Sequence, residues 1–475
     1  MKTFRSYKQQ KKAVLNNETT CFDITKAYLQ KIKKEAYINA FVEVFDEECL
    51  KRAIKIDAKI KKGKAGKLAG MVIGIKDNIC FKDHEVAAAS KILRGFKSLY
   101  SATVVKRLLE EDALIIGRLN CDEFAMGSAN ENTIYGPVKN PHDTQKVAGG
   151  SSGGCAAAVS AGLCLAALGS DTGGSIRQPS AFCGVIGLKP TYSRVSRYGL
   201  IAYSSSCDQI GPITNTIYDA GLILEVIAGH DINDNTSSTK KIEDFSNTPK
   251  FKKPKKIAYL SECINREGLH FDVKNRFNNI IHKLKKRNHI VEQVSFPYLD
   301  FLVPTYYVIT TAEASSNLAR YDGVHYGYRS KNISDLESTY INSRTEGFGL
   351  EVKRRIMLGT FVLSAGYSQK YFTKAQKIRK IIQEKTQKIL QEYDFVISPT
   401  TPHTAFKLGE KYNDPTAMYL EDIFTVQANL SGNPAISIPS GKDNKGMPIG
   451  IQLMGNHFKE KELLAFSKII SNLKE

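Results

Sequence analysis

The sequence predicts an α/β fold built on a central β-sheet, and three observations support this class. Short apolar runs bounded by glycine or polar residues alternate with segments whose apolar residues recur every three or four positions. Apolar residues make up 42% of the chain and charged residues 24%, a balance that allows a large buried core. No internal repeat or low-complexity tract interrupts the alternation, which is typical of helices packed on a sheet.

The N-terminal half begins with a helical region, at about residues 1–65, and continues into a core rich in glycine and serine at about 70–215. Within it, apolar spacing predicts helices at 24–34, 48–62 and 103–113, and short apolar runs predict strands at 71–75 and 113–117. The alanine- and glycine-rich stretch 154–168 is too short to span a bilayer. We expect a buried helix there that runs into a buried strand.

The C-terminal half contains a predicted β-α-β unit, formed by a strand at 256–260, a helix at 271–287 and a strand at 289–294. A polar segment at about 231–256 precedes this unit, and its composition predicts a linker or surface loop rather than an interdomain hinge. The elements expected after it are helices at 370–392 and 461–473 and strands at 395–398, 435–439 and 449–454. We therefore expect residues 1–475 to form a single domain.

Composition restricts the function classes only in part. The net charge of +19 favours a polyanionic partner such as nucleic acid, but lysine-rich solvated helix faces explain it equally well. The nine cysteines are odd in number and contain no Cys-x-x-Cys spacing, which argues against a disulfide framework and against a zinc site. The N-terminal sequence has no apolar run or cleavage site of a secretory signal, so we expect a cytoplasmic protein.

Two Gly-Gly-Ser elements, ending at Ser151 and Ser175, flank the apolar stretch. Glycine permits positive φ angles and close approach of the backbone to a ligand. The backbone N–H groups of Thr172, Gly173, Gly174 and Ser175 could therefore point inward together. Such a cluster stabilises an oxyanion, and the loss of one donor typically costs roughly 2.7–4 kcal/mol of the barrier.

A single lysine, Lys76, ends the apolar run 71–75. The simplest interpretation is a surface lysine at a strand end. A catalytic lysine must instead be neutral, which requires its pKa to fall by roughly three units, about 4 kcal/mol of environment. Burial between apolar strands could lower the pKa by this amount.

Two other interpretations of the glycine-rich segment are open from the residues alone. The glycines could form simple turns or hold a phosphate, although no Walker-type or dinucleotide-binding motif is present. Residues 149–153 also match Gly-x-Ser-x-Gly, the nucleophile elbow of α/β-hydrolases. That elbow requires a later aspartate and histidine, and no histidine of the chain lies in a motif.

Three segments resemble the defining segments of the amidase-signature family: GIKDNI (74–79), GGSSGG (149–154) and GSDTGGSIRQPSAFCGVIGLKPTY (169–192). The resemblance implies the amidase-signature fold, a central mixed β-sheet flanked by helices on both faces. It also implies a Ser–cis-Ser–Lys triad with Ser175 as nucleophile, Ser151 as bridging serine and Lys76 as base. The implied reaction is hydrolysis of an amide through an acyl-enzyme, with the oxyanion held by Thr172, Gly173 and Gly174.

The flanking segments 120–143, 194–214 and 346–361 are similar to one branch of this family, the glutaminase subunits of tRNA-dependent amidotransferases. This resemblance implies that the chain frees ammonia from glutamine. A B subunit then uses the ammonia, with ATP and Mg, to convert Glu-tRNA(Gln) to Gln-tRNA(Gln), and a C subunit completes a heterotrimer. The chain itself is expected to hold no metal or cofactor, and to meet tRNA mainly through the B subunit.

The same resemblance implies a glutamine pocket at Tyr306, Arg355 and Asp422. Glutamine is a zwitterion, so its carboxylate suits a guanidinium and its ammonium suits a carboxylate. The register leaves Tyr307 and Arg354 as alternatives. Two other functions stay open, a free-standing amidase for another small amide and a basic RNA-binding scaffold.

Overall fold

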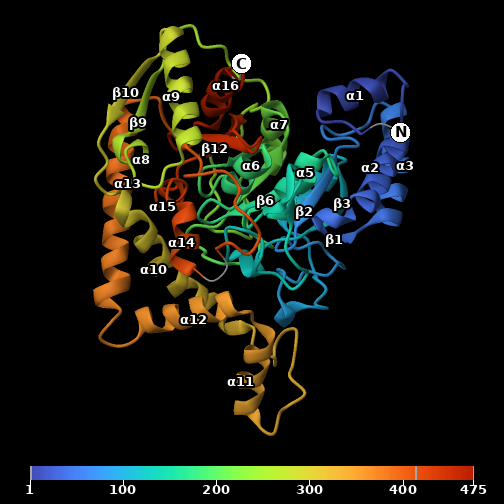
Figure 1. The fold of residues 1–475 in the computed structure, drawn as a ribbon. Helices are drawn as coiled ribbons and strands as arrows, with labels where there is room; N and C mark the ends of the chain where they lie inside the picture. Colours follow the sequence, from blue (N-terminus) through green and yellow to red (C-terminus); the bar gives the residue numbers. More distant parts are fainter. Residues whose placement is uncertain (1–2, 412–413, 474–475) are drawn as a thin grey trace.

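The computed structural model describes residues 3–411 and 414–473, and its centre is a mixed sheet of eleven strands (Figure 1). The strands are β1 (Phe41–Val44), β2 (Val72–Lys76), β3 (Leu114–Leu119), β6 (Ala166–Asp171), β7 (Ile186–Lys189), β8 (Gln209–Thr214), β9 (Lys256–Leu260), β10 (Ile290–Val294), β11 (Phe395–Pro399), β12 (Ala435–Lys442) and β13 (Pro448–Gly455). Their order is β1-β3-β2-β6-β8-β7-β12-β13-β11-β9-β10. A separate two-stranded sheet pairs β4 (Lys139–Asn140) with β5 (Asp143–Val147).

Helices pack around this sheet, and two of them project away from it at the bottom of the view (Figure 1). They are α1 (Tyr7–Leu15), α2 (Cys21–Lys34), α3 (Asp46–Lys61), α4 (Thr103–Glu110), α5 (Gly153–Ala161), α6 (Arg177–Cys183), α7 (Ile217–Ile227), α8 (Ser261–Ile264), α9 (Phe271–Lys286), α10 (Leu299–Asn317), α11 (Leu336–Gly347), α12 (Leu350–Leu363), α13 (Lys374–Glu392), α14 (Pro415–Tyr419), α15 (Val426–Leu430) and α16 (Glu460–Ser471). The predicted α/β class, a central mixed sheet flanked by helices, is confirmed.

Three central strands position the candidate site. Strand β2 runs parallel to β3 on one side and to β6 on the other, so all three end at the same edge of the sheet. Every residue of β2 is buried, including Lys76 at its end. Helix α5 is buried along its whole length and ends at Gly162, whose φ of 68° is the left-handed conformation that favours glycine. The chain then returns through β6 to the glycines before α6.

Most of the predicted elements are confirmed within a few residues. The predicted β-α-β unit is present, with β9 and β10 parallel and Ile290 opposite Lys256, although the short helix α8 is inserted before α9. The strand predicted at 71–75 begins one residue later, at Val72, and includes Lys76. Helix α13 begins at Lys374 rather than at residue 370, because residues 369–373 form a π-helical turn.

The polar segment has no helix or strand between α7 and β9, but it is not wholly on the surface. Phe245 is fully buried, and Gly221 of α7 packs against the backbone of Phe245. A connected set of buried apolar side chains extends from Phe4 to Leu473, as a single-domain chain requires. The single-domain interpretation itself stays a prediction. None of the described helices has the length and apolarity needed to cross a bilayer.

Candidate active site

Lys76 lies at the centre of a buried polar cluster at the ends of β2 and β6. Its Nζ lies 2.7 Å from Oγ of Ser151 and 2.9 Å from Oγ of Ser170. Nδ2 of Asn78 donates to the same Ser170 hydroxyl at 3.0 Å. The Lys76 side chain is fully buried, and this burial lowers its pKa from the usual value of 10.5. The structure therefore favours the neutral amine that a base requires.

A tight turn presents Ser151 to this lysine. The Gly150–Ser151 peptide bond is cis, as the family resemblance implies. The N–H of Gly150 donates to Oε1 of Gln178 at 2.9 Å, and the carbonyl of Ser151 accepts from the N–H of Asp122 at 3.2 Å. A Cβ atom at Gly150 would collide with the Asp122 carboxylate, so only glycine fits there. The turn is thus held on both sides of the serine.

Ser175 reaches the cluster from the loop between β6 and α6. Its carbonyl accepts a hydrogen bond from the N–H of Ser152 at 3.1 Å, and 8% of the residue is exposed. Among the described residues, no hydrogen-bond partner is found for the Ser175 hydroxyl. The structure therefore brings Lys76 into contact with Ser151 and places Ser175 beside Ser152, without a direct hydrogen bond between the two candidate catalytic serines.

The backbone around Ser175 offers unused donors. The N–H groups of Thr172, Gly173, Gly174 and Ser175 have no acceptor within the described part of the chain, although all four residues are buried. A buried N–H group without a partner is unfavourable unless a ligand or water accepts from it. Gly174 has a φ of 144°, a conformation that few other residues adopt. Such a cluster of donors is suited to an oxyanion.

A buried ion pair stabilises the loop that carries these donors. Arg177 Nη2 lies 2.9 Å from Oδ1 of Asp171, and Arg177 Nη1 donates to the carbonyl of Thr425 at 2.8 Å. Burial alone would raise the pKa of Asp171, but the charge and hydrogen bonds of Arg177 lower it to about 2. Thr425 in turn donates from Oγ1 to the carbonyl of Gly173 at 2.6 Å. These bonds fix both ends of the turn.

Arg355, one of the predicted pocket residues, lies in a cage of three tyrosine rings, of which only Tyr307 was considered from the sequence. Its Nη1 donates to the Tyr203 hydroxyl at 2.8 Å, and its Nε lies 2.8 Å from Glu351. The rings of Tyr203, Tyr307 and Tyr419 lie 5.1–5.5 Å from the guanidinium carbon. No described residue accepts a hydrogen bond from the third nitrogen, Nη2. The guanidinium group of Arg355 is thus buried, and its Nη2 is available to a ligand.

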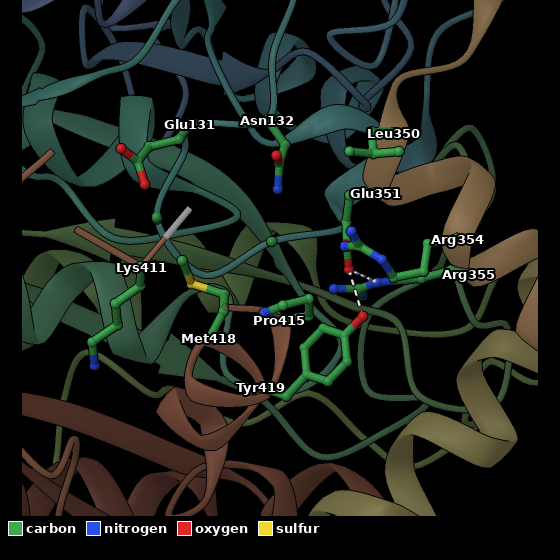
Figure 2. A pocket seen from close by; sticks show the side chains of 12 residues that line it. Glu131, Asn132, Leu350, Glu351, Arg354, Arg355, Lys411, Pro415, Met418 and Tyr419 are labelled. Carbon is green, nitrogen blue, oxygen red and sulfur yellow. Dashed lines mark hydrogen bonds and ion pairs between the residues drawn. The ribbon is translucent and has the colours of Figure 1, made fainter. Parts of the chain in front are cut away.

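The alternative register is less favourable for a binding role. The side chain of Arg354 is 37% exposed and contacts Glu351, whereas that of Arg355 is 3% exposed. Figure 2 shows Glu351 between Arg354, Arg355 and the hydroxyl of Tyr419. This arrangement supports Arg355 as the pocket cation. Tyr307 packs on Tyr419, whereas Tyr306 packs against Gly173.

Asp422 supplies a carboxylate near the same pocket. Ser128 Oγ lies 3.1 and 3.2 Å from its two carboxylate oxygens. Burial raises the pKa of Asp422 to about 8, although Ser128 and Arg355 act in the opposite direction. Tyr306 lies between Asp422 and the backbone N–H groups of residues 172–175, because its ring packs directly against Gly173 and leaves no room for a Cβ atom there. The two groups of predicted residues are therefore neighbours.

A cavity of about 110 Å³ adjoins this region (Figure 2). Arg355 and Tyr419 line it on one side, and Gly127 and Ala129, which flank Ser128, line it on another. Figure 2 shows the side chains of Glu131, Lys411 and Met418 around the same space. No group of three or more His, Cys, Asp or Glu side chains that could hold a metal ion occurs among the described residues.

Several residues of the site were not predicted. Ser170 and Asn78 contact or support Lys76, Gln178 and Asp122 hold the turn at Ser151, and Ser128 contacts Asp422. Ser170, Asn78 and Gln178 lie inside the segments that carry the family resemblance, so their position was a usable signal. Their individual contacts depend on tertiary geometry that spacing does not encode.

The chain is similar to known proteins along nearly its whole length. The model of the Amidase family matches residues 23–464. The A subunit of glutamyl-tRNA(Gln) amidotransferase from Chlorobium phaeobacteroides is 47% identical over 472 residues, 99% of each chain. The protein of the same name from Chlorobaculum parvum is 48% identical, over 99% of this chain and 98% of the relative.

Solved structures agree with these relatives. The crystal structure of the glutamyl-tRNA(Gln) amidotransferase A subunit from Thermotoga maritima is 40% identical, with a TM-score of 0.77 over 94% of this chain and 90% of that chain. The structure of peptide amidase from Stenotrophomonas maltophilia is 26% identical, with a TM-score of 0.82 over 97% of this chain and 96% of that chain.

Proposed function

The chain belongs to the amidase family, and on that premise we propose that it hydrolyses glutamine as the A subunit of a glutamyl-tRNA(Gln) amidotransferase. The observation that carries the proposal is the pairing of two features. One is the buried contact of Lys76 with Ser151 beside free backbone donors. The other is a cavity lined by Arg355, with the buried carboxyl group of Asp422 bound to Ser128, whose two chain neighbours line the same cavity. Full-length relatives of that name support it.

In the proposed reaction, the hydroxyl oxygen of Ser175 attacks the side-chain carbonyl carbon of glutamine. Ser151 passes the Ser175 proton to neutral Lys76, which burial supports by lowering the lysine pKa. The N–H groups of Thr172, Gly173 and Gly174 accommodate the negative charge on the carbonyl oxygen. The C–N bond then breaks, and ammonia leaves with the proton returned from Lys76. Water hydrolyses the acyl-enzyme to glutamate and restores Ser175.

The relay requires a small rearrangement when substrate binds, because no hydrogen bond joins the Ser175 hydroxyl to Ser151 among the described residues. Catalytic hydrogen bonds are often long in a free enzyme and shorten in the substrate complex. We expect rotation of the Ser175 side chain about its Cα–Cβ bond to bring its oxygen to Ser151 while the backbone stays fixed. The buried Asp171–Arg177 pair supports a fixed backbone.

Recognition of the amino-acid end is assigned to Arg355, Asp422 and Tyr306. The free face of the Arg355 fork suits a carboxylate, and Asp422 suits the ammonium group. Tyr306 lies between this pocket and Gly173, where it can orient the side-chain amide. The combination favours a zwitterionic amide over a simple alkyl amide.

We further propose that the ammonia is used by partner subunits of a heterotrimer in the cytoplasm. A B subunit would bind Glu-tRNA(Gln) and use ATP and Mg for the transamidation, and a C subunit would join the two larger subunits. The name shared by the relatives describes one subunit of an amidotransferase, which supports a multi-subunit enzyme. The alternative, a free-standing amidase, requires no partner.

Ammonia release from glutamine tests the proposal. The wild-type chain and a Ser175→Ala variant are assayed alone and after addition of B and C subunits encoded in the same genome. We expect strong stimulation by the partners and no ammonia from the variant, which lacks the nucleophile. Activity that ignores the partners and is higher on other amides would identify a free-standing amidase. Unchanged turnover in the variant would exclude the triad.

A further inference from the structure

Two lysine-rich segments outside the active site contain no acidic residue. Residues 245–261 carry five lysines, and residues 273–291 carry six lysines and arginines, with no aspartate or glutamate in either. The first segment leads into β9, and the second covers most of α9 and the start of β10. These two stretches hold eleven of the 67 lysines and arginines of the chain and are separated by a short connection.

The fold brings these two segments together at one edge of the sheet. The N–H of Lys255 donates to Nδ1 of His289 at 3.1 Å, and the N–H of Ile290 donates to the carbonyl of Lys255 at 3.0 Å. Strands β9 and β10 are parallel, so both begin at this edge. Figure 1 shows α9 alongside β9 and β10. The residues that follow α9 therefore lie next to Lys255 and Lys256.

We call the exposed cations of this region the basic edge: Lys250, Lys252, Lys253, Lys256, Lys285, Lys286 and Arg287. None of these seven side chains forms an ion pair with a described residue. Asp394 forms its ion pair, at 2.9 Å, with Lys255 instead. The basic edge is thus a group of exposed cations that form no ion pair, although the Asp394 carboxylate lies beside Lys256 and accepts from its N–H at 2.9 Å.

Local stability explains only part of this arrangement. Basic residues in the last turn of a helix interact favourably with the helix dipole, which accounts for Lys285 and Lys286. It does not account for Lys250, Lys252 and Lys253, which lie in a loop. Neighbouring like charges repel each other, and a polyanion removes this repulsion while releasing its own counterions.

We propose that the basic edge binds the phosphate backbone of RNA. The choice of RNA among polyanions rests on the proposed function, in which the complex acts on tRNA. The edge consists of long cationic side chains, whose contacts to phosphates position an RNA without reading its bases. Binding is therefore expected to depend on salt and to be largely independent of base sequence.

The test compares two variants of the full-length chain that have the same net charge. The edge variant replaces four cations of the basic edge: Lys252→Glu, Lys253→Glu, Lys285→Glu and Lys286→Glu. The control variant replaces four exposed lysines of α2 and the end of α3, which also form no ion pair: Lys33→Glu, Lys34→Glu, Lys61→Glu and Lys62→Glu. Figure 1 shows α2 and α3 on the side of the molecule away from α9.

Binding of transcribed tRNA(Gln) is measured by fluorescence anisotropy at 50–200 mM KCl. Each phosphate contact contributes about 0.7–0.9 to the slope of log affinity against log salt. We expect the edge variant to bind at least tenfold more weakly at 50 mM KCl, with a slope smaller by about 3. The control variant should stay within about twofold of the wild type. Equal weakening of both variants, or no binding by the wild type, would overturn the proposal.

Two further measurements make the result specific. Ammonia release from glutamine without RNA should be unchanged in both variants, so failure of RNA binding and failure of the glutaminase are separate outcomes. If the edge variant loses assembly with B and C subunits but keeps its RNA affinity, the basic edge is a protein interface and the proposal is wrong. If the edge variant does not fold, glutamine substitutions at the same four positions replace it, with an expected slope change of the same sign.

Discussion

Replacement of Lys76 by methionine tests the central feature of the site. Methionine keeps an unbranched side chain of similar length but has no amine, so the contacts of Nζ with Ser151 and Ser170 are lost. A positioned general base typically contributes 10²- to 10⁴-fold to the rate. We expect ammonia release from glutamine to fall by about that factor, because no other described side chain forms a hydrogen bond with Ser151 Oγ.

The same substitution has a predictable effect on stability. Burial lowers the pKa of Lys76 in the folded chain below its unfolded value of 10.5. Between these two pKa values the unfolded chain binds a proton at Lys76 that the folded chain does not bind. The free energy of unfolding of the wild type therefore rises with pH there, by about 1.4 kcal/mol per pH unit from this group. Methionine does not titrate, so the variant lacks this contribution.

Urea unfolding of both proteins at pH 7, 8 and 9 measures the difference. We expect the stability of Lys76→Met relative to the wild type to improve as the pH falls through this window. A constant offset of about 1–3 kcal/mol against the variant is also expected, because the Ser151 hydroxyl loses its buried partner. A stability difference that is independent of pH would refute the assignment of a neutral buried lysine. Recovery of activity in the variant at high pH alone would refute its role as base.

Two other substitutions address the remaining contacts. Arg355→Ala should raise the KM for glutamine about 10- to 100-fold, because a charge-assisted hydrogen bond contributes roughly 1.5–3 kcal/mol. Hydrolysis of a neutral alkyl carboxamide should change little. Equal effects on both substrates would place Arg355 outside the carboxylate site. Ser170→Ala removes a hydroxyl group that binds both Lys76 and Asn78, and it should lower kcat by about tenfold with KM unchanged. Ser170→Thr keeps the hydroxyl group and should retain most of the wild-type kcat. A loss of kcat in both variants would indicate that Ser170 has only a packing role.

Much of the fold could be predicted from the sequence where the apolar pattern was strong. The run 71–75 and the run 113–117 are buried strands, and the alternation around 256–294 is a parallel β-α-β unit. Helices α10 and α12 were not predicted. Helix α10 carries apolar residues on several sides and contains Pro304, so it shows neither a helical stripe nor the usual absence of proline.

The candidate site could be predicted only as far as residue types. Glycines and serines near 149–175 indicated a catalytic turn, and Lys76 was a candidate because it ends an apolar strand. The hydroxyl that holds Lys76 beside Ser151 comes from Ser170, which is 94 positions away in the chain. Local spacing could not indicate this contact, because it depends on the parallel pairing of β2 with β6.

Burial has opposite consequences for the two titratable groups of the proposed site. It favours the neutral form of Lys76, which is the form that the proposed reaction needs. It also favours the neutral form of Asp422, whereas binding of an ammonium group needs the ionised form. With a pKa of about 8, Asp422 is mostly protonated at pH 7 in the free protein. The ammonium group of glutamine must therefore supply the charge that ionises this carboxyl, and binding should release close to one proton.

Isothermal titration of glutamine into the Ser175→Ala variant measures this proton, because the variant binds without turnover. At pH 7 the observed heat should vary with the ionisation enthalpy of the buffer, with a slope that corresponds to the release of most of one proton. The added substitution Asp422→Asn should remove the dependence. Heats that are the same in all buffers would mean that Asp422 is already ionised or does not meet the ammonium group. A neutral amide cannot ionise Asp422, so this coupling would also favour glutamine over uncharged amides.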